Sequence, residues 1–99
     1  MIIVMGYVTV DPSYVNEFNN DIQTLAVSTR LQEGCLFYVT NLDDKSTGRM
    51  LVAERWQDKA ALTSHLKRDE TVMFLNKWGN MLKNDVRIFD ASNEQTLMD

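Results

Sequence analysis

The fold is decided by the stretch at residues 2–10, which reads IIVMGYVTV. Its apolar side chains fall on both alternate faces, with Ile2 and Val4 on one face and Ile3 and Met5 on the other. Strands that are covered on both faces have this pattern, whereas a strand with one wet face alternates apolar and polar residues. The stretch therefore predicts a strand in the middle of a sheet.

The residues that follow predict a helix. Asp11 can accept backbone N–H bonds as an N-cap, and Pro12 fits the first helical position because an N–H there would have no partner. Apolar residues then recur at steps of three and four, which predicts one amphipathic helix over about residues 12–32. Gly34 offers the left-handed residue that commonly ends a helix.

The rest of the chain predicts a hairpin, two further helices and a last strand. Two aromatic and β-branched runs, 35–42 and 49–56, are joined by a polar stretch with turn chemistry, which indicates a hairpin. Helical spacing resumes after Asp58 in a short helix and, beyond a polar interruption at 67–70, in a second one. A short strand over 86–91 is the last predicted element and is expected at an edge of the sheet.

The predicted order β-α-β-β-α-β indicates an α+β, ferredoxin-like arrangement, a four-stranded antiparallel sheet with its helices on one face. The chain of 99 residues is expected to form one domain over 1–91 and to end in an aperiodic tail over 92–99. Because both faces of the sheet are apolar, the face without helices would be a larger apolar patch than soluble monomers usually tolerate. We therefore expect a homodimer that packs these faces together.

Charge and composition narrow the function classes. The net charge is −4 and the ten Lys and Arg residues are scattered, so we expect no nucleic-acid partner. No apolar run approaches the ~20 residues that span a bilayer, and the first residues lack the basic opening of a secretory signal. We therefore expect no membrane contact and a cytoplasmic location, with which the single Cys35 agrees.

The sequence carries no strong cofactor or metal motif. It has no phosphate-binding glycine loop, no Gly-x-Gly-x-x-Gly, no Cys-x-x-Cys and no Gly-x-Ser-x-Gly. Its one His and one Cys stand thirty residues apart, so a tetrahedral metal site would need carboxylates to complete it. We therefore expect neither a metal site nor a bound cofactor.

His65 is the first candidate for chemistry, because it is the only imidazole and its ordinary pKa lies near neutral pH. It lies beside Leu62 on the inward side of a helix, where either a core role or a ligand-binding role explains it. Glu54 and Trp56 share one face of a strand, where the carboxylate can pair with a cation or cap a helix and the indole can be core or offer its N–H to a cavity. Further aromatic surface, which core packing also explains, comes from Tyr38, Phe74 and Trp78.

Several of these residues occur in a characteristic order and spacing. They are Arg30-x-x-Glu33-Gly34-Cys35-x-x-Tyr38, then Glu54-x-Trp56, Ala60-Ala61, His65-Leu66 nine residues after the tryptophan, and Phe74. From Val4 to about Phe89 the chain resembles the antibiotic biosynthesis monooxygenase (ABM) family, which includes the small quinol monooxygenases.

The resemblance implies a dimeric α+β barrel with a pocket between sheet and helices in each subunit. It also implies oxidation of a small phenolic or quinol aromatic by O₂ without flavin, haem or metal. Deprotonation makes such a substrate oxidisable, and His65 is the expected base because its ordinary pKa lies near the working pH. Tyr38 and the Trp56 N–H are expected to hydrogen-bond oxygens of the substrate or of a peroxy intermediate. The expected substrate-binding residues are Phe74 and Trp78, which would stack on the ring, with Glu54 and Leu62.

Other functions fit the same scaffold. A non-catalytic dimeric barrel could bind a small apolar ligand, and an isomerase could use the same pocket. Haem-degrading relatives carry an Asn on the first strand and a His ten residues after a Trp. Haem degradation is disfavoured here, because the first strand has no Asn and His65 follows Trp56 by nine residues. The sequence leaves open which strand face lines the pocket.

Overall fold

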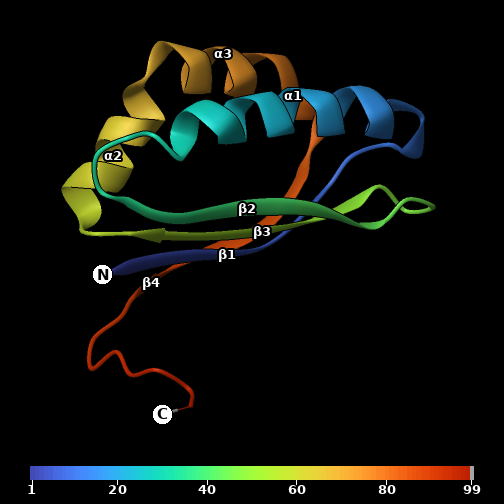
Figure 1. Cartoon of the computed structure of the whole chain (residues 1–99). Helices are drawn as coiled ribbons and strands as arrows, with labels where there is room; N and C mark the ends of the chain where they lie inside the picture. Colours follow the sequence, from blue (N-terminus) through green and yellow to red (C-terminus); the bar gives the residue numbers. More distant parts are fainter. Residues whose placement is uncertain (99) are drawn as a thin grey trace.

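A computed structural model describes residues 1–98 and confirms the predicted fold class. In chain order its main elements are β1 (Ile2–Thr9), α1 (Val15–Thr29), β2 (Cys35–Asp44), β3 (Arg49–Trp56), α2 (Lys59–Lys67), α3 (Asp69–Trp78) and β4 (Lys83–Asp90). The strands form an antiparallel sheet in the order β2-β3-β1-β4, and the helices lie together on one face of it (Figure 1). This is the ferredoxin-like arrangement that the sequence predicts.

β1 lies in the middle of the sheet, as its apolar pattern on both faces predicts. It pairs with β3 on one side and with β4 on the other. Ile2 and Val4 face the helices and are buried, whereas Met5 on the opposite, open face is 48% exposed. Glu54 pairs with Val4 on one side and with Tyr38 on the other, and all three are buried. The structure thus places Glu54 and Tyr38 on the helix-covered face.

The first helix is shorter than predicted. Asp11 caps it as expected, since its carboxylate accepts a hydrogen bond from a backbone N–H at 2.9 Å, but the turn that it closes is 3₁₀. The α-helix itself covers Val15–Thr29 rather than 12–32. Gly34 does not end the helix directly; it has φ of +83°, and a Cβ there would lie 2.5 Å from the Cβ of Ala61. This glycine therefore lets the loop after α1 pass close to α2.

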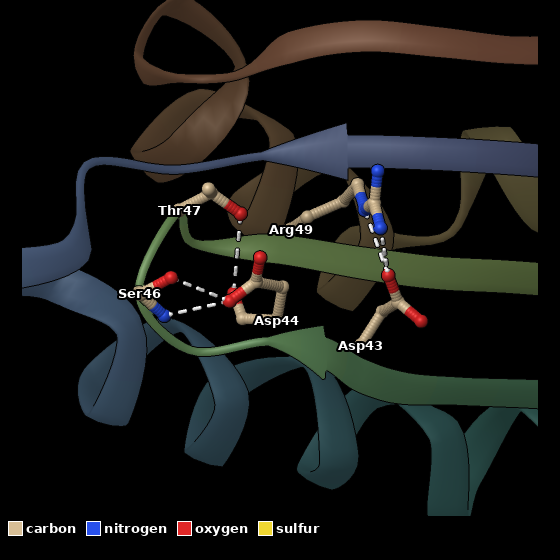
Figure 2. Close-up of polar contacts among 5 residues, drawn as sticks. All are labelled: Asp43, Asp44, Ser46, Thr47 and Arg49. Carbon is tan, nitrogen blue, oxygen red and sulfur yellow. Dashed lines mark hydrogen bonds and ion pairs between the residues drawn. The ribbon is translucent and has the colours of Figure 1, made fainter.

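Local polar bonds hold the turn of the β2–β3 hairpin (Figure 2). The Asp44 carboxylate accepts hydrogen bonds from the backbone N–H and the hydroxyl of Ser46, at 3.0 and 2.7 Å, and these bonds lower its pKa. Arg49 Nε donates to the Asp43 carboxylate at 2.7 Å. This turn chemistry confirms the hairpin and fixes the register that carries Glu54 onto the covered face.

The second half of the chain differs from the prediction at its boundaries. The expected polar interruption at 67–70 is a single extended residue, Arg68, with ψ of 144°. Asp58 caps α2, since its carboxylate accepts a backbone N–H bond at 2.8 Å. α3 ends at Trp78 in a 3₁₀ turn, and β4 begins at Lys83 rather than at residue 86. The early, polar residues of β4 join the sheet because they pair with the central strand.

β4 forms one edge of the sheet, as predicted, and the chain then leaves on the side away from the helices (Figure 1). Backbone hydrogen bonds between Met1 and Ala91 hold the two ends of the sheet region together. The predicted tail over 92–99 ends at Asp99, which lies outside the described residues. Within residues 1–98, no helix combines the length and the apolar character that a bilayer crossing requires.

Candidate functional site

A cavity of about 310 Å³ lies between the sheet and the helices. All four strands contribute to its floor and all three helices to its roof. Most of its lining is apolar, and the polar members are Tyr38, Glu54, His65, Thr71 and Asn84. The exposed apolar side chains of the lining lie on α2, α3 and β4, which places the opening between these elements: Leu66, Leu75 and Ile88. An apolar cavity with a few polar groups is the usual form of a small-molecule site.

Most of the predicted site residues line this cavity. Five of the seven do so: Tyr38, Glu54, Leu62, His65 and Phe74. The two that do not are the indoles, Trp56 and Trp78. The fold therefore brings together residues from β2, β3, α2 and α3 and places both tryptophans behind the cavity wall.

Trp56 holds two of the cavity residues in place. It is fully buried, and its Nε1–H donates to Glu54 Oε1 at 2.9 Å. Its ring stacks on His65, with 4.8 Å between the ring centroids and 28° between the planes. The sequence predicts that this N–H reaches a substrate oxygen, whereas the structure commits it to Glu54. Trp56 is thus a positioning residue.

Trp78 belongs to the core between α1 and α3. Its N–H donates to the Asp21 carboxylate at 2.9 Å, and its ring meets the edge of Phe18 at a centroid distance of 5.0 Å. Both contacts tie α3 to α1. The predicted stacking role on a substrate is therefore left to Phe74, which does line the cavity.

His65 is neutral in this environment. It is 3% exposed, and burial lowers its pKa to about 4, with the nearby Arg68 cation acting in the same direction. Its Nδ1 lies 3.2 Å from the side-chain amide of Gln32, and this contact leaves the other ring nitrogen, Nε2, for a different partner. The expectation that His65 titrates near neutral pH is therefore wrong, because the sequence does not show how completely the ring is buried.

Glu54 is the cavity group that titrates near neutral pH. It is 8% exposed, and burial raises its pKa to about 7 against the opposing effect of the Trp56 hydrogen bond. Among residues 1–98, no Lys, Arg or His forms an ion pair with it. None of the described helices takes its N-terminal cap from Glu54 either. The described part of the chain therefore shows neither of the two structural roles that the sequence offered for this carboxylate.

Tyr38, Glu54 and His65 lie together and form what we call the polar corner of the cavity. The Tyr38 ring meets the His65 ring edge-on at a centroid distance of 5.7 Å. Burial and the neighbouring Glu54 carboxylate raise the pKa of the phenol, which therefore stays a neutral hydrogen-bond donor. The Arg30 side chain binds the backbone carbonyl of Tyr38 at 2.9 Å and holds this part of β2 to the end of α1.

The sequence does not single out two polar cavity residues, Thr71 and Asn84. Thr71 lies on the apolar face of α3, and its polar character on that face is the only signal that could have marked it. Asn84 lies in a part of β4 that the sequence leaves outside the last strand, and its side chain accepts a hydrogen bond from the Val86 N–H at 2.9 Å. Among residues 1–98, no cluster of three or more His, Cys, Asp or Glu side chains is arranged to hold a metal ion.

Comparison with known proteins decides the family. The sequence pattern of the antibiotic biosynthesis monooxygenases matches residues 1–77. The chain belongs to the ABM family. A Synechocystis protein of uncharacterised function is 29% identical to this ABM protein over 98 residues, which cover 97% of this chain and 67% of the Synechocystis protein.

Solved structures share the ABM fold. A Deinococcus radiodurans protein, provisionally named an antibiotic biosynthesis monooxygenase, superposes with a TM-score of 0.87 at 20% identity, over 100% of both chains. A Caulobacter crescentus protein with the same provisional name gives a TM-score of 0.81 at 23% identity, over 93% of this chain and 90% of that one. At these identities the likeness shows the fold alone.

The family match covers most of the candidate site in this ABM protein. It ends at residue 77, so it includes the polar corner of Tyr38, Glu54 and His65. Trp78 and Asn84 lie beyond it. The match therefore establishes the family for the part of the chain that carries the polar corner.

Proposed function

We propose that this ABM protein is a cofactor-independent monooxygenase that uses O₂ to oxidise a small phenolic or quinol substrate. The observation that supports it most is the buried Glu54 carboxyl, which lines a mostly apolar cavity and has its pKa raised to about 7. A carboxyl group tuned in this way can accept a proton at neutral pH.

The proposed reaction requires a substrate, O₂ and a base. Transfer of a hydroxyl proton to Glu54 turns the quinol into an electron-rich phenolate. A ring carbon of this phenolate bonds to one oxygen atom of O₂, and the O–O bond of the resulting peroxide breaks as water leaves with the transferred protons. One oxygen atom stays on the ring, the other becomes water, and the quinol supplies every electron as it becomes a hydroxyquinone.

The other cavity residues bind and orient the substrate in this proposal. Tyr38 donates a hydrogen bond to a substrate oxygen, and Nε2 of His65 accepts one from a hydroxyl group. Phe74 and Leu62 contact the ring and exclude water, which strengthens the polar interactions beside it. His65 thus has a binding role, and the base is Glu54.

Oxygen uptake tests the proposal. The purified protein is mixed with a panel of hydroquinones and naphthols in the presence of a chelator, and O₂ is followed with an electrode. We expect at least one quinol to be consumed with one molecule of O₂ per molecule of substrate. Compounds that quench tryptophan fluorescence while O₂ stays constant would instead indicate a non-catalytic binding protein, and rearrangement without O₂ uptake would indicate an isomerase.

Trp56→Phe is expected to shift the activity to higher pH. The indole hydrogen bond is the interaction that lowers the pKa of Glu54, so its loss leaves burial unopposed. For a hydrogen bond of ordinary strength to a charged group, the midpoint of kcat/KM against pH should rise by about one unit. Phe keeps an aromatic ring against His65, and circular dichroism checks the fold. An unchanged midpoint would contradict the role given to Trp56.

The proposed assembly is a homodimer in which two sheets pack through their open faces. This face carries a set of exposed apolar side chains: Met5, Tyr7, Phe37, Val39 and Phe89. Two arginines make cation–π contacts on this face. Cζ of Arg49 lies 4.7 Å from the centroid of the Tyr7 ring, and Cζ of Arg55 lies 4.8 Å from that of the Phe37 ring. Such a surface resembles the core of an oligomer interface more than the surface of a monomer.

Val39→Glu is expected to convert the dimer into monomers. Val39 lies on the open face, and dimerisation would bury its new charge without a partner. Sedimentation velocity measures the change, which should exceed tenfold in the dimer dissociation constant. Val27→Glu, the same change at an exposed position of α1, is the control and should leave the dimer intact. A Val39→Glu protein that sediments as the wild type does would rule out this interface.

A further inference from the structure

The cavity contains a buried hydroxyl group that has no partner. Thr71 is 3% exposed and lines the cavity, and its Oγ1 makes no hydrogen bond within residues 1–98. A buried hydroxyl in this state loses its bonds to water without replacement. Its presence on the apolar face of α3 therefore requires a partner that the polypeptide itself does not supply.

The position of Thr71 in α3 explains why the helix does not satisfy it. Threonine hydroxyls within helices commonly bond to the carbonyl of the preceding turn, as Thr29 does with the carbonyl of Leu25 at 2.7 Å. Thr71 is the third residue of α3, and the extended Arg68 just before that helix removes the preceding turn. The hydroxyl is therefore free to bond with a molecule in the cavity.

Glu54 and Thr71 lie on opposite layers of the cavity. Glu54 belongs to the sheet floor through β3, and Thr71 belongs to the helical roof through α3. The rest of the cavity lining is mostly apolar, with Phe74 one turn beyond Thr71 on the same helix. A flat aromatic ring with an oxygen at each end would satisfy both groups and fill the apolar space between them.

We propose that Thr71 is a specificity-determining residue, whose hydroxyl bonds the second oxygen of an aromatic diol while the first oxygen lies at Glu54. The inference rests on the proposed function and narrows it to substrates with two oxygen groups. A monophenol leaves the Thr71 hydroxyl unpaired, so it binds more weakly than the diol. A hydroxyl group can donate or accept this bond, and it therefore serves both the quinol and the oxidised product.

The test compares two ligands that differ in one oxygen. 1,4-Dihydroxynaphthalene and 1-naphthol are titrated into the protein under nitrogen, and binding is followed by quenching of tryptophan fluorescence. Wild-type protein should bind the diol more tightly. Thr71→Val keeps the shape of the side chain and removes its oxygen, and it should weaken diol binding about fivefold to tenfold while leaving naphthol binding unchanged. Thr71→Ser retains the oxygen and should keep the diol preference.

Two controls separate a ligand-binding role from a structural one. Thr29→Val makes the same change at a buried hydroxyl that already has a partner, and it should leave both affinities unchanged. Thr71→Val should unfold at a urea concentration no lower than that of the wild type, because the ligand-free protein loses no hydrogen bond. A marked fall in that concentration would overturn the inference.

The outcomes also distinguish this inference from the proposed function. Binding is measured without O₂, so loss of the diol preference in Thr71→Val supports the role of Thr71 even if no oxygen uptake is found. Equal weakening of both ligands, an unchanged diol preference, or a wild-type protein that binds neither ligand would overturn the role of Thr71, even if the protein consumes O₂ with another quinol.

Discussion

Replacement of Glu54 by Gln is expected to lower kcat for oxygen uptake by about 10²–10⁴-fold, the usual contribution of a positioned general base. The amide has nearly the shape of the carboxyl group and can still accept the Trp56 hydrogen bond, so the cavity should keep its form. What it loses is the ability to take up a proton. The measurement is the rate of O₂ consumption with a quinol that the wild type oxidises.

The pH profile adds a second readout for the same variant. A base must be ionised to act, so wild-type kcat/KM should rise with pH and level off above a midpoint near pH 7, the pKa of Glu54. Glu54→Gln should lack this step. Glu33→Gln, at an exposed position, is the control and should behave as the wild type. Wild-type rates in Glu54→Gln would show that another group, or the solvent, removes the proton.

His65 supplies the complementary comparison. Because burial lowers its pKa to about 4, it is a weak base at neutral pH and its proposed contribution is a hydrogen bond. His65→Gln should therefore reduce activity less than Glu54→Gln and should keep the step near pH 7. A loss of that step in His65→Gln alone would return the role of base to the imidazole.

The fold could be predicted from the sequence because its signals are local. Asp11 and Asp58 mark helix starts by their capping chemistry, and residues 2–10 reveal a central strand by their apolar pattern on both faces. The start of β4 could not be predicted in the same way. Its first residues are polar, and they are strand only because the backbone of β1 pairs with them, which is a contact between distant parts of the chain.

The sequence predicts which residues lie at the site better than it predicts what each of them does there. Period-two spacing places Glu54 and Trp56 on one face, but the direction of the indole N–H depends on a side-chain rotamer that no spacing reveals. The pKa of His65 depends on how completely α2 and the sheet cover it, which is a property of the whole fold. Thr71 is missed because its significance lies in the partner that it lacks.

The two shifted pKa values predict opposite effects of pH on stability. Glu54 has a pKa of about 7 in the fold against 4.5 when exposed, so between these values unfolding releases a proton and stability falls as pH rises. His65 has a pKa of about 4 in the fold against 6.5 when exposed, so unfolding takes up a proton there and stability rises with pH. Between pH 4.5 and 6.5 the two effects nearly cancel.

Variants that remove one of the two groups should therefore show a pH dependence of the unfolding free energy that is cancelled in the wild type. Glu54→Gln leaves the His65 effect, so the free energy of unfolding should rise by about 2 to 3 kcal/mol from pH 4.5 to 6.5 relative to the wild type, and His65→Gln should make it fall by a similar amount. Urea titrations at fixed protein concentration measure both. Carboxylates with lowered pKa, such as Asp21, act mainly below this range and are common to all three proteins, so they drop out of the differences. If the unfolding free energy of both variants depends on pH as that of the wild type does, then burial shifts the pKa of neither Glu54 nor His65.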